Sequence, residues 1–251
     1  MELIWDQVRL YFPKSQRGLQ ECSLRVRSGS FTVLSGPNGC GKSLLAEIGS
    51  ALLKAQKGRV LLNGQDILKK PRLARGKIGL VFQDSESQIV GQTIGEDCSF
   101  GPSNLSLSPQ EVQMRTQSAL EVCGLTGRDQ ESVFHLSGGE KKRLALAGLL
   151  AMDCPVLILD EPFNGLDWPG TRDLLAVLVE LHNKGKTLLV ITHDLDKVLA
   201  HATDLALMNQ GRIIAQGPPQ DLWNQLEEAQ VRRPRSFAHE IPLCTWLEPE
   251  S

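Results

Sequence analysis

A glycine-rich segment near the start of the chain has the residue types that bind phosphate. Its residues are Gly36, Pro37, Asn38, Gly39, Cys40, Gly41, Lys42, Ser43 and Leu44. Up to Ser43 they fit the pattern G-x-x-x-x-G-K-[ST], in which glycines let backbone N–H groups curl around an anion. A helix that begins here would point its positive end at the phosphates. We expect the Lys42 ammonium to reach the β- and γ-phosphates and the Ser43 hydroxyl to contact Mg²⁺.

A pair of acids, Asp160 and Glu161, ends an apolar stretch of strand length at residues 156–159. Taken alone, the pair is also what an exposed strand end looks like. If this strand is parallel to the one before Gly36, both ends meet at one sheet edge, where α/β proteins bind ligands. Asp160 would then hold the water shell of Mg²⁺. Glu161 would orient or deprotonate a water molecule beside the γ-phosphate.

A second helix start with anion-binding character lies just before a strongly helical run at residues 141–152. It consists of Ser137, Gly138, Gly139 and Glu140. Ser137 is a good N-cap, and the two glycines leave backbone N–H groups exposed. Considered alone, these residues are better explained by an ordinary capped helix, so their meaning depends on the other motifs.

The elements that must position these residues follow from hydrophobic periodicity and turn signals. We predict strands at residues 3–10, 22–26, 31–35, 58–62, 78–82, 156–159, 187–191, 205–208 and 212–215. We predict helices at residues 43–53, 111–122, 137–152, 171–182 and 195–202. The alternation of strands and helices implies an α/β fold with a mostly parallel sheet. Residues 84–150 interrupt the alternation and are predicted to form a helical insert.

Composition excludes several classes of protein. The chain has 251 residues, and 27 Lys and Arg against 29 Asp and Glu give a net charge of −2, so no general electrostatic attraction to nucleic acid or anionic membrane is expected. No apolar run approaches the roughly 20 residues that span a bilayer, and the N-terminus lacks the features of a secretory signal. None of the six cysteines has CxxC or zinc-site spacing, so free thiols are expected. We expect a soluble intracellular protein whose role at a membrane, if any, comes through partners.

The motifs in their chain order resemble the nucleotide-binding subunit of an ABC ATPase. After the phosphate turn come Gln83, the pentapeptide at residues 136–140, the strand with its acids at 156–162, the segment 164–167, and His193 after the strand at 187–191. The pentapeptide separates this family from other P-loop proteins. The resemblance covers roughly residues 1–222 and implies a P-loop NTPase fold, with a mostly parallel core sheet, an N-terminal antiparallel β-subdomain and an inserted helical subdomain at about 84–150. It also implies ATP and Mg²⁺ as ligands and ATP hydrolysis as the activity.

The resemblance assigns catalytic and metal-binding roles to matching positions. Gln83 resembles the glutamine that senses Mg²⁺ and the attacking water, and His193 resembles the switch histidine that contacts the γ-phosphate and supports Glu161. The implied catalytic residues are therefore Glu161, His193, Gln83 and Lys42. The implied Mg²⁺ residues are Ser43, Gln83 and Asp160.

Further positions are implied to bind the nucleotide or a second subunit. Tyr11 stands where the family often keeps an aromatic side chain that stacks on adenine, an interaction that contributes about 1–3 kcal/mol by analogy with bases on aromatic platforms; the alternative is a surface residue at a strand end. Asp167 matches the intersubunit loop. Ser137 and Gly139 are implied to grip the γ-phosphate of ATP bound to the other subunit, so that ATP joins two subunits.

The segment after Gln83 favours one subgroup. Residues 93–97 fit T-[IV]-x-x-D and residues 100–105 fit F-G-P-x-N-L, which is similar to the energy-coupling-factor, or cobalt-type, importer ATPases. This resemblance implies a peripheral protein on the cytoplasmic face of the cell membrane, with a transmembrane coupling protein and a small substrate-binding membrane protein as partners and no nucleic acid. The implied solutes are vitamins, Co²⁺ or Ni²⁺. On physical grounds a groove near Gln83 is expected to receive a partner's helix, and a plain surface loop is the alternative.

Other classes of nucleotide-binding protein share some of these motifs. The ATPase of a conventional ABC importer or an exporter fits the core motifs equally well, and only residues 93–105 argue against it. A soluble ABC ATPase of DNA repair would carry a long coiled coil before the pentapeptide, for which the chain has no room, and one of translation would carry two ATPase halves. A kinase or other nucleotide binder lacks the pentapeptide.

The C-terminal tail, residues 223–251, has no readable element. Residues 231–235 are basic. This stretch is predicted to be a solvated linker, and the alternatives are a role in dimerisation or contact with anionic headgroups, at roughly 1 kcal/mol per basic residue. Intact motifs permit a homodimer.

Overall fold

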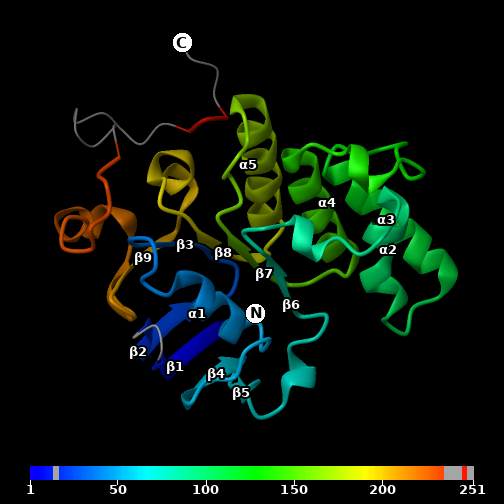
Figure 1. Ribbon diagram of the computed structural model, residues 1–251. Coiled ribbons are helices and arrows are strands. Elements are labelled where there is room, and N and C mark those ends of the chain that lie inside the picture. Colours follow the sequence, from blue (N-terminus) through cyan, green and yellow to red (C-terminus); the bar gives the residue numbers. More distant parts are fainter. Residues whose placement is uncertain (14–16, 235–244, 248–251) are drawn as a thin grey trace.

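A six-stranded sheet forms the centre of the molecule (Figure 1). In the computed structural model, which describes residues 1–13, 17–234 and 245–247, the strand order is β10-β9-β3-β8-β7-β6. The strands are β3 (Phe31–Ser35), β6 (Ile78–Val81), β7 (Val156–Asp160), β8 (Thr187–Ile191), β9 (Asp204–Asn209) and β10 (Arg212–Gly217). All neighbours pair in parallel except β10, which is antiparallel to β9. The predicted mostly parallel sheet is confirmed.

A smaller antiparallel sheet is built mainly from the N-terminal residues. Its order is β2-β1-β4-β5, and its strands are β1 (Leu3–Phe12), β2 (Arg17–Val26), β4 (Lys57–Leu62) and β5 (Gln65–Asp66). Helix α1 (Lys42–Gly49) shares one buried cluster with both sheets, and Leu45 of this helix is fully buried there with Trp5 and Ile158. The Trp5 indole N–H donates to the Leu45 carbonyl at 3.0 Å. The helix that carries the phosphate turn is therefore held between two sheets.

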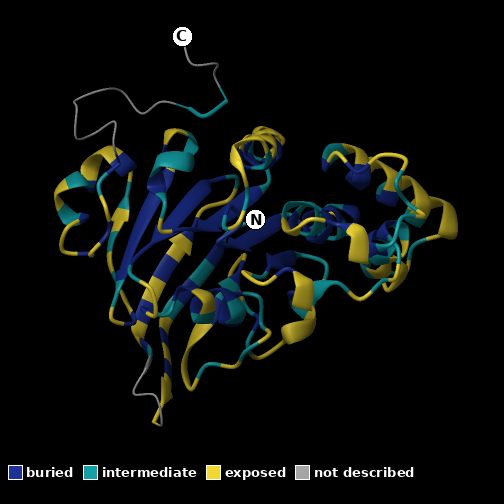
Figure 2. Cartoon of the chain, turned by 45° about the horizontal axis from the view of Figure 1, so that its top comes forward, coloured by how far each residue is buried: buried dark blue, intermediate teal, exposed yellow. Residues whose placement is uncertain are grey.

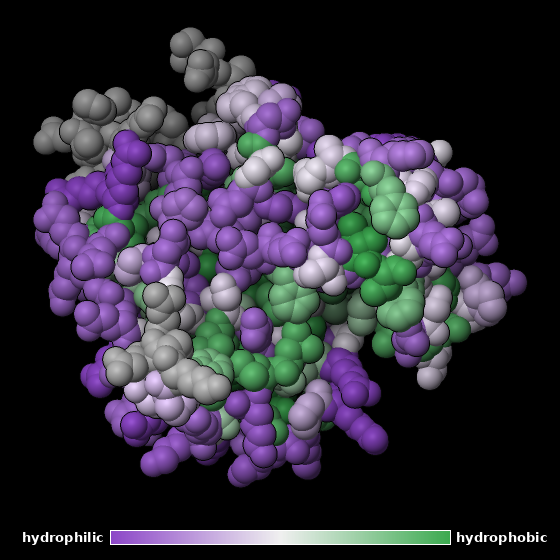
Figure 3. Space-filling model, viewed as in Figure 1, coloured by the Kyte–Doolittle hydropathy of each residue, from purple (hydrophilic) through white to green (hydrophobic). Residues whose placement is uncertain are grey.

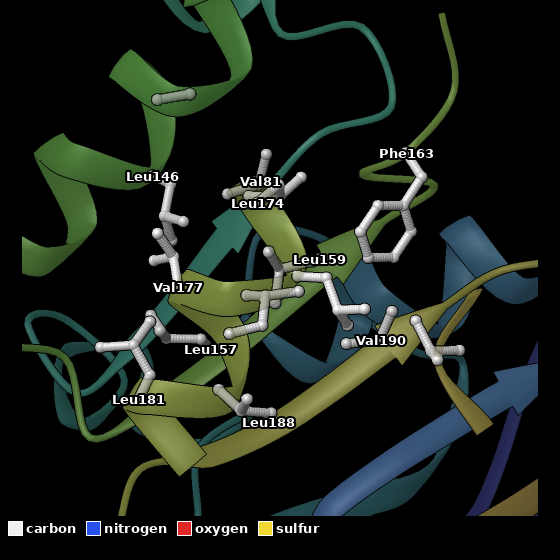
Figure 4. Packing of buried hydrophobic residues seen from close by; sticks show 14 of the residues in the cluster. Val81, Leu146, Leu157, Leu159, Phe163, Leu174, Val177, Leu181, Leu188 and Val190 are labelled. Atoms are coloured by element: carbon white, nitrogen blue, oxygen red, sulfur yellow. The ribbon is translucent and has the colours of Figure 1, made fainter. Parts of the chain in front are cut away.

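The opposite face of the core sheet packs against two long helices, α4 (Gly138–Ala151) and α5 (Trp168–Asn183). Figure 4 shows Leu157 and Leu159 of β7 among the α5 side chains. The alternate residues Val156 and Ile158 belong to the cluster on the α1 side. This period-two alternation follows from strand geometry, and Figure 2 shows the central strands buried throughout. Burial of each such side chain contributes about 1.5–3 kcal/mol.

A helical lobe of α2 (Ile94–Ser103), α3 (Pro109–Val122) and α4 lies between β6 and β7 in the chain and to the right in Figure 1. Capping boxes start all three helices. The start of α3 at Pro109, after the N-cap Ser108, agrees with the predicted signal. Helix α2 was not predicted because its last turn contains glycine and proline. Gly101 packs closely there, since a Cβ would lie 2.5 Å from the Met152 sulfur and a larger residue would displace that side chain.

Two predicted helices differ from the structure. The helix predicted at residues 43–53 ends at Gly49, with Ser50 as C-cap and Ala51 at a φ of 60°. The helix predicted at 195–202 is wrong and is replaced by two 3-10 turns, η4 (Leu195–Lys197) and η5 (Leu199–His201). Val198 between them has φ −125° and ψ −19°, and no side chain caps either turn, so a continuous helix is interrupted. The other 3-10 turns are η1 (Pro71–Leu73), η2 (Glu86–Gln88), η3 (Val133–His135), η6 (Pro219–Asp221) and η7 (Trp223–Gln225).

Part of the predicted tail belongs to the packed molecule. Leu226, Ala229 and Val231 are buried in the same cluster as the core helices. Further on, the Thr245 hydroxyl bonds His201 Nε2 at 2.7 Å, and the Lys197 ammonium lies 6.0 Å from the Trp246 ring centre. Residues 235–244 and 248–251, including Arg235 of the basic stretch, lie outside the described residues. Within the described ranges, no helix combines the length and the apolar character needed to cross a bilayer.

Candidate active site

The predicted motifs meet along one edge of the core sheet. Strands β3, β8, β7 and β6 are consecutive neighbours and parallel, so their carboxyl ends lie side by side. Gly36 follows β3, His193 follows β8, Glu161 follows β7 and Gln83 follows β6. An edge of this kind is where ligands bind in open α/β sheets. The structure thus brings together residues from four distant parts of the sequence.

The phosphate turn presents a buried ammonium and a free helix start. Lys42 is only 7% exposed, and its Nζ donates to the carbonyls of Gly36 at 2.8 Å and Pro37 at 3.1 Å. The N-cap of α1 is Gly41, whose φ of 112° excludes most other residues, and no side chain caps the helix. The first N–H groups of α1 are therefore unclaimed by a capping side chain, as an anion site requires.

Contacts that the sequence did not predict hold the turn in place. A Cβ on Gly36 would lie 2.1 Å from the Met208 carbonyl oxygen, so β9 packs directly against the turn. The backbone N–H of Gly211, in the β9–β10 hairpin, donates to the Cys40 carbonyl at 3.0 Å. Gly211 shows no motif of its own, because its partner is distant in sequence.

Asp160 has the properties of a cation ligand. It is 5% exposed, and burial raises the pKa of its carboxyl above the ordinary value, opposed by a hydrogen bond from Ser43. One carboxylate oxygen, Oδ1, is buried without any hydrogen-bond partner. A buried carboxylate oxygen with no partner is costly, and a hard cation next to the Ser43 hydroxyl would satisfy it. The residues therefore fit Mg²⁺.

Glu161 and His193 form a direct pair. The Nδ1 atom of His193 lies 2.9 Å from Oε1 of Glu161. The Glu161 side chain is 7% exposed, whereas that of His193 is 54% exposed. The backbone of Glu161 has a φ of 48°, in the left-handed region, and its N–H donates to the Ile191 carbonyl at 2.9 Å. The carboxylate thus leaves the strand in a fixed direction, with the histidine between it and solvent.

A buried lysine lies directly behind this pair. Lys142 of α4 is 8% exposed, and its Nζ donates to the carbonyls of Glu161, at 3.3 Å, and of Asn164. Burial lowers the pKa of Lys142, and the nearby Glu161 charge opposes that shift. The residue belongs to a run of basic residues after the pentapeptide, and nothing in the sequence of that run distinguishes it from its less buried neighbours.

The pentapeptide caps α4 through its own glutamate. The Ser137 Oγ accepts from the Glu140 N–H at 3.3 Å, and Oε2 of Glu140 accepts from the Ser137 N–H and hydroxyl, each at 2.8 Å. The other oxygen, Oε1, accepts from Arg128 at 2.5 Å. Arg128 also donates to both oxygens of Glu131. These bonds lower the pKa of Glu140 to about 2, the Arg128 guanidinium being the largest cause.

Ser137 is not joined to the phosphate turn within this chain. No hydrogen bond among the described residues links the two. Instead, a Cβ on Gly139 would lie 2.9 Å from Leu166, in the loop that leads to α5. Asp167 caps α5 by accepting from the Gly170 N–H at 2.9 Å. Trp168 follows at 52% exposed, with the Arg172 guanidinium 4.9 Å from its ring centre.

Gln83 and Tyr11 are both exposed. Just beyond Gln83, the Gln88 side chain accepts from Phe82 N–H at 3.2 Å and donates to the Leu80 carbonyl at 3.0 Å, which holds the end of β6. Tyr11 is 43% exposed and pairs through its backbone with Gly18. The Gly18 carbonyl in turn lies 3.8 Å from a Cβ position on Gly41. Gly18 thus lies next to both Tyr11 and the phosphate turn.

Among the described residues, the structure shows no reactive thiol and no cluster of metal ligands beside this site. The five cysteines within the described residues are free and buried, and burial raises the pKa of Cys22, Cys98 and Cys123 to about 12. In those same residues there is no group of three or more His, Cys, Asp or Glu suited to a metal ion. Asp160 would hold its cation together with a hydroxyl and bound phosphate, which is not such a group.

Comparisons with known proteins agree with this geometry. A family profile described as ABC transporter matches residues 19–164. The energy-coupling factor transporter ATP-binding protein EcfA of Methanocaldococcus jannaschii is 40% identical over 93% of this chain and 86% of its own length. EcfA2 of Methanospirillum hungatei is 41% identical over 89% of this chain, which spans only 56% of that relative. Among solved structures, cbiO1 from Clostridium perfringens, described as part of the ABC transporter complex cbiONQ, has a TM-score of 0.80 and 33% identity, covering 95% of this chain and 98% of its own.

Proposed function

The chain belongs to the ABC transporter family of ATPases, and from that premise we propose that it powers the import of a micronutrient through membrane partners of the energy-coupling-factor type. The micronutrient is a vitamin or a Co²⁺ or Ni²⁺ ion. The chain itself binds and hydrolyses ATP and makes no contact with the solute.

One observation carries the ATPase assignment. The carboxylate of Glu161, after β7, pairs at 2.9 Å with His193, which follows β8, the neighbour of the strand that leads into the phosphate turn. A buried acid that is oriented by a histidine suits a general base near a γ-phosphate. Lys42 supplies positive charge at the phosphates once its ammonium leaves the carbonyls of its own turn.

The reaction follows from these positions. A water molecule oriented by Glu161 attacks the γ-phosphorus, the bond from that phosphorus to the β–γ bridging oxygen breaks, and the water's proton passes to Glu161. The products are ADP and inorganic phosphate. Mg²⁺, held by Asp160 and Ser43 with Gln83 beside them, would neutralise charge on the phosphates. His193 keeps the Glu161 carboxylate directed toward the water.

A second subunit completes the site in this proposal. Ser137, Gly138 and Gly139 begin a helix whose N–H groups suit an anion, yet they have no bond to the phosphate turn of their own chain. We assign them to the γ-phosphate of ATP on a partner subunit, with Asp167 at the seam. The loop that carries Asp167 packs on Gly139 through Leu166, so both elements would face the partner together.

A substitution at Glu161 tests the enzyme. In Glu161→Gln the base is lost while the side chain keeps its size, so ATP turnover should fall by at least 100-fold, since one positioned base contributes about 10²–10⁴-fold. The variant should bind ATP and accumulate as a dimer in light scattering or native mass spectrometry, whereas wild type returns to monomer after hydrolysis. Undiminished turnover in this variant would remove Glu161 from the mechanism.

The membrane partner is proposed to meet the helical lobe. Large apolar side chains are exposed on the segment from η2 to η3, among them Val90 at 62%, Phe100 at 57% and Phe134 at 83%. Figure 3 shows apolar side chains gathered between the strand-rich half and the lobe of α2, α3 and α4. Exposed apolar side chains of this kind suit an interface.

Affinity purification from detergent-solubilised membranes of the native host tests the transport role. We expect two membrane proteins to co-purify, one of them small, and expect Phe100→Glu to release them while ATP turnover of the isolated chain is unchanged. Co-purification of a large transporter of the conventional importer or exporter type would replace the energy-coupling-factor assignment. Recovery of ribosomes or DNA in place of membrane proteins would overturn transport altogether.

A further inference from the structure

Lys142 is a buried cation that the proposed chemistry does not use. Buried lysines are rare unless they are paired, and this one has no carboxylate within ion-pairing distance among the described residues. Its Nζ instead donates to two backbone carbonyls, those of Glu161 and Asn164. The charge is retained in a site where burial lowers the pKa of the ammonium. Burial of this ammonium costs free energy, and we therefore expect the buried charge to serve a function.

The two acceptors delimit the turn that carries the catalytic carboxylate. The Glu161 carbonyl also accepts from the Asn164 N–H, at 3.2 Å. The ammonium therefore clamps a turn from Glu161 to Asn164 at both of its ends. Glu161 itself has a φ of 48°, a conformation that persists for a residue other than glycine only where the surroundings hold it.

We infer that Lys142 is a positioning residue for ATP hydrolysis: its ammonium, carried on α4, sets the direction in which the Glu161 carboxylate leaves the sheet. His193 contacts the carboxylate from the solvent side, and Lys142 fixes the backbone from the protein side. Without the ammonium, the partly buried Asn164 carbonyl loses its donor, and the turn is free to relax. The inference rests on the proposed ATPase function.

Geometry favours positioning over general support of the fold. Within the described part of the chain, the Lys142 ammonium donates hydrogen bonds only to the turn after β7, whereas the hydrophobic contacts of α4 with the sheet run through Leu144, Leu146 and Ala147. Removal of the ammonium should therefore displace the carboxylate more than it destabilises the helix. A displacement of about 1 Å at a catalytic group costs up to 10²-fold in rate.

The test is a pair of variants measured for both turnover and binding. Lys142→Met keeps the length of the side chain and removes its charge. We expect kcat to fall 10- to 100-fold, with the KM for ATP within threefold of wild type, because Lys42 and the phosphate turn are untouched. Lys186→Met is the matched control, since Lys186 is also poorly exposed, at 19%, but pairs with Asp153 away from the site. This control should stay within twofold of wild type in both constants.

A double-mutant cycle separates positioning from structural support. If Lys142 acts through the carboxylate, Lys142→Met should lower the residual kcat of Glu161→Ala by less than twofold. A full 10-fold loss in that background, or a kcat of Lys142→Met equal to that of Lys186→Met, would overturn the inference. Lys142→Gln, whose amide can still donate to the turn, should recover part of kcat and provides the same cycle if the methionine variant unfolds. Inactive wild-type protein would instead overturn the proposed function.

Discussion

At the scale of single residues, the carboxylate of Asp160 is expected to bind a cation and, when no cation is bound, to lower the stability of the fold. Its buried carboxylate has a raised pKa and one oxygen without a partner, so the charge is unfavourable in the folded protein until a cation arrives. Asp160→Asn removes that charge. In EDTA we expect the variant to unfold at an equal or higher free energy than wild type, and to lose the gain in melting temperature that MgATP gives wild type.

The pH dependence of this effect has a definite sign. Because the folded-state pKa is raised, the folded protein binds more protons than the unfolded chain between the ordinary value and the folded one. This contribution to stability is present at low pH and is lost as pH rises through that window. The difference between Asp160→Asn and wild type in EDTA should therefore shrink on acidification, as measured by urea unfolding. A wild type more stable than the variant at neutral pH in EDTA would contradict the argument.

Tyr11 offers a clean test because a matched neighbour exists. Tyr11 and Phe12 lie together at the end of β1 and are 43% and 41% exposed. If Tyr11 stacks on adenine, Tyr11→Ala should weaken ATP binding by about 1–3 kcal/mol, and Phe12→Ala should leave affinity within twofold. Titration with a fluorescent ATP analogue measures both. Equal affinities of the two variants would return Tyr11 to the role of a surface residue.

The sequence was enough to predict those residues that belong to a short, recognisable motif. Lys42, Ser43, Asp160 and Glu161 stand in recognisable patterns, and the structure places them at one sheet edge. Lys142 and Arg128 could not be found in this way, because their partners are 19 and 12 residues away and each looks like a surface charge in its own segment.

At the scale of elements, the start of α4 depends on a charge from another segment. Arg128 neutralises Glu140 while the same carboxylate caps Ser137. The lowered pKa means that the unfolded chain binds the proton more tightly than the folded protein. The contribution is therefore present above the ordinary carboxyl pKa and is lost as pH falls toward about 2.

We therefore predict that Glu140→Gln is less stable than wild type at pH 7 by roughly 1.5 kcal/mol, the lower end of the range for a hydrogen bond to a charged group. The amide keeps the cap but loses the ion pair. The difference should narrow between pH 4.5 and pH 3, and chemical denaturation at several pH values measures it. Glu111→Gln, in the equivalent but exposed capping box of α3, is the control and should change little. If the difference in free energy of unfolding between Glu140→Gln and wild type did not change with pH, the ion pair could not be its source.

Elements with strong periodicity were predicted well, and those built by contacts were not. Strands β3 and β8 have the predicted bounds. Helix α2 was missed because Gly101 and Pro102 read as breakers, although the glycine packs closely on Met152 and the last turn tolerates the proline. The segment after His193 has helical periodicity, yet nothing caps it and it breaks at Val198.

At the scale of the whole molecule, α/β alternation was enough to predict a mostly parallel sheet with a helical lobe between β6 and β7. Strand order was not predictable from alternation, since β3 lies between β8 and β9, strands that come more than 150 residues later. That order places the four segments that we propose to be catalytic on neighbouring strand ends. The phosphate turn is also braced by the β9–β10 hairpin, a contact visible only in the assembled fold.

The exposed Trp168 makes the molecule its own optical probe. It directly follows Asp167, at the seam that we assign to the second subunit, and it is 52% exposed with Arg172 over its ring. Trp5, by contrast, is completely buried and bonded to Leu45, so its emission should stay constant when subunits associate. If the dimer closes over Trp168, its fluorescence should shift to shorter wavelength as ATP is added, and Trp168→Phe should abolish the shift. Closure and reopening could then be followed in real time without an attached dye.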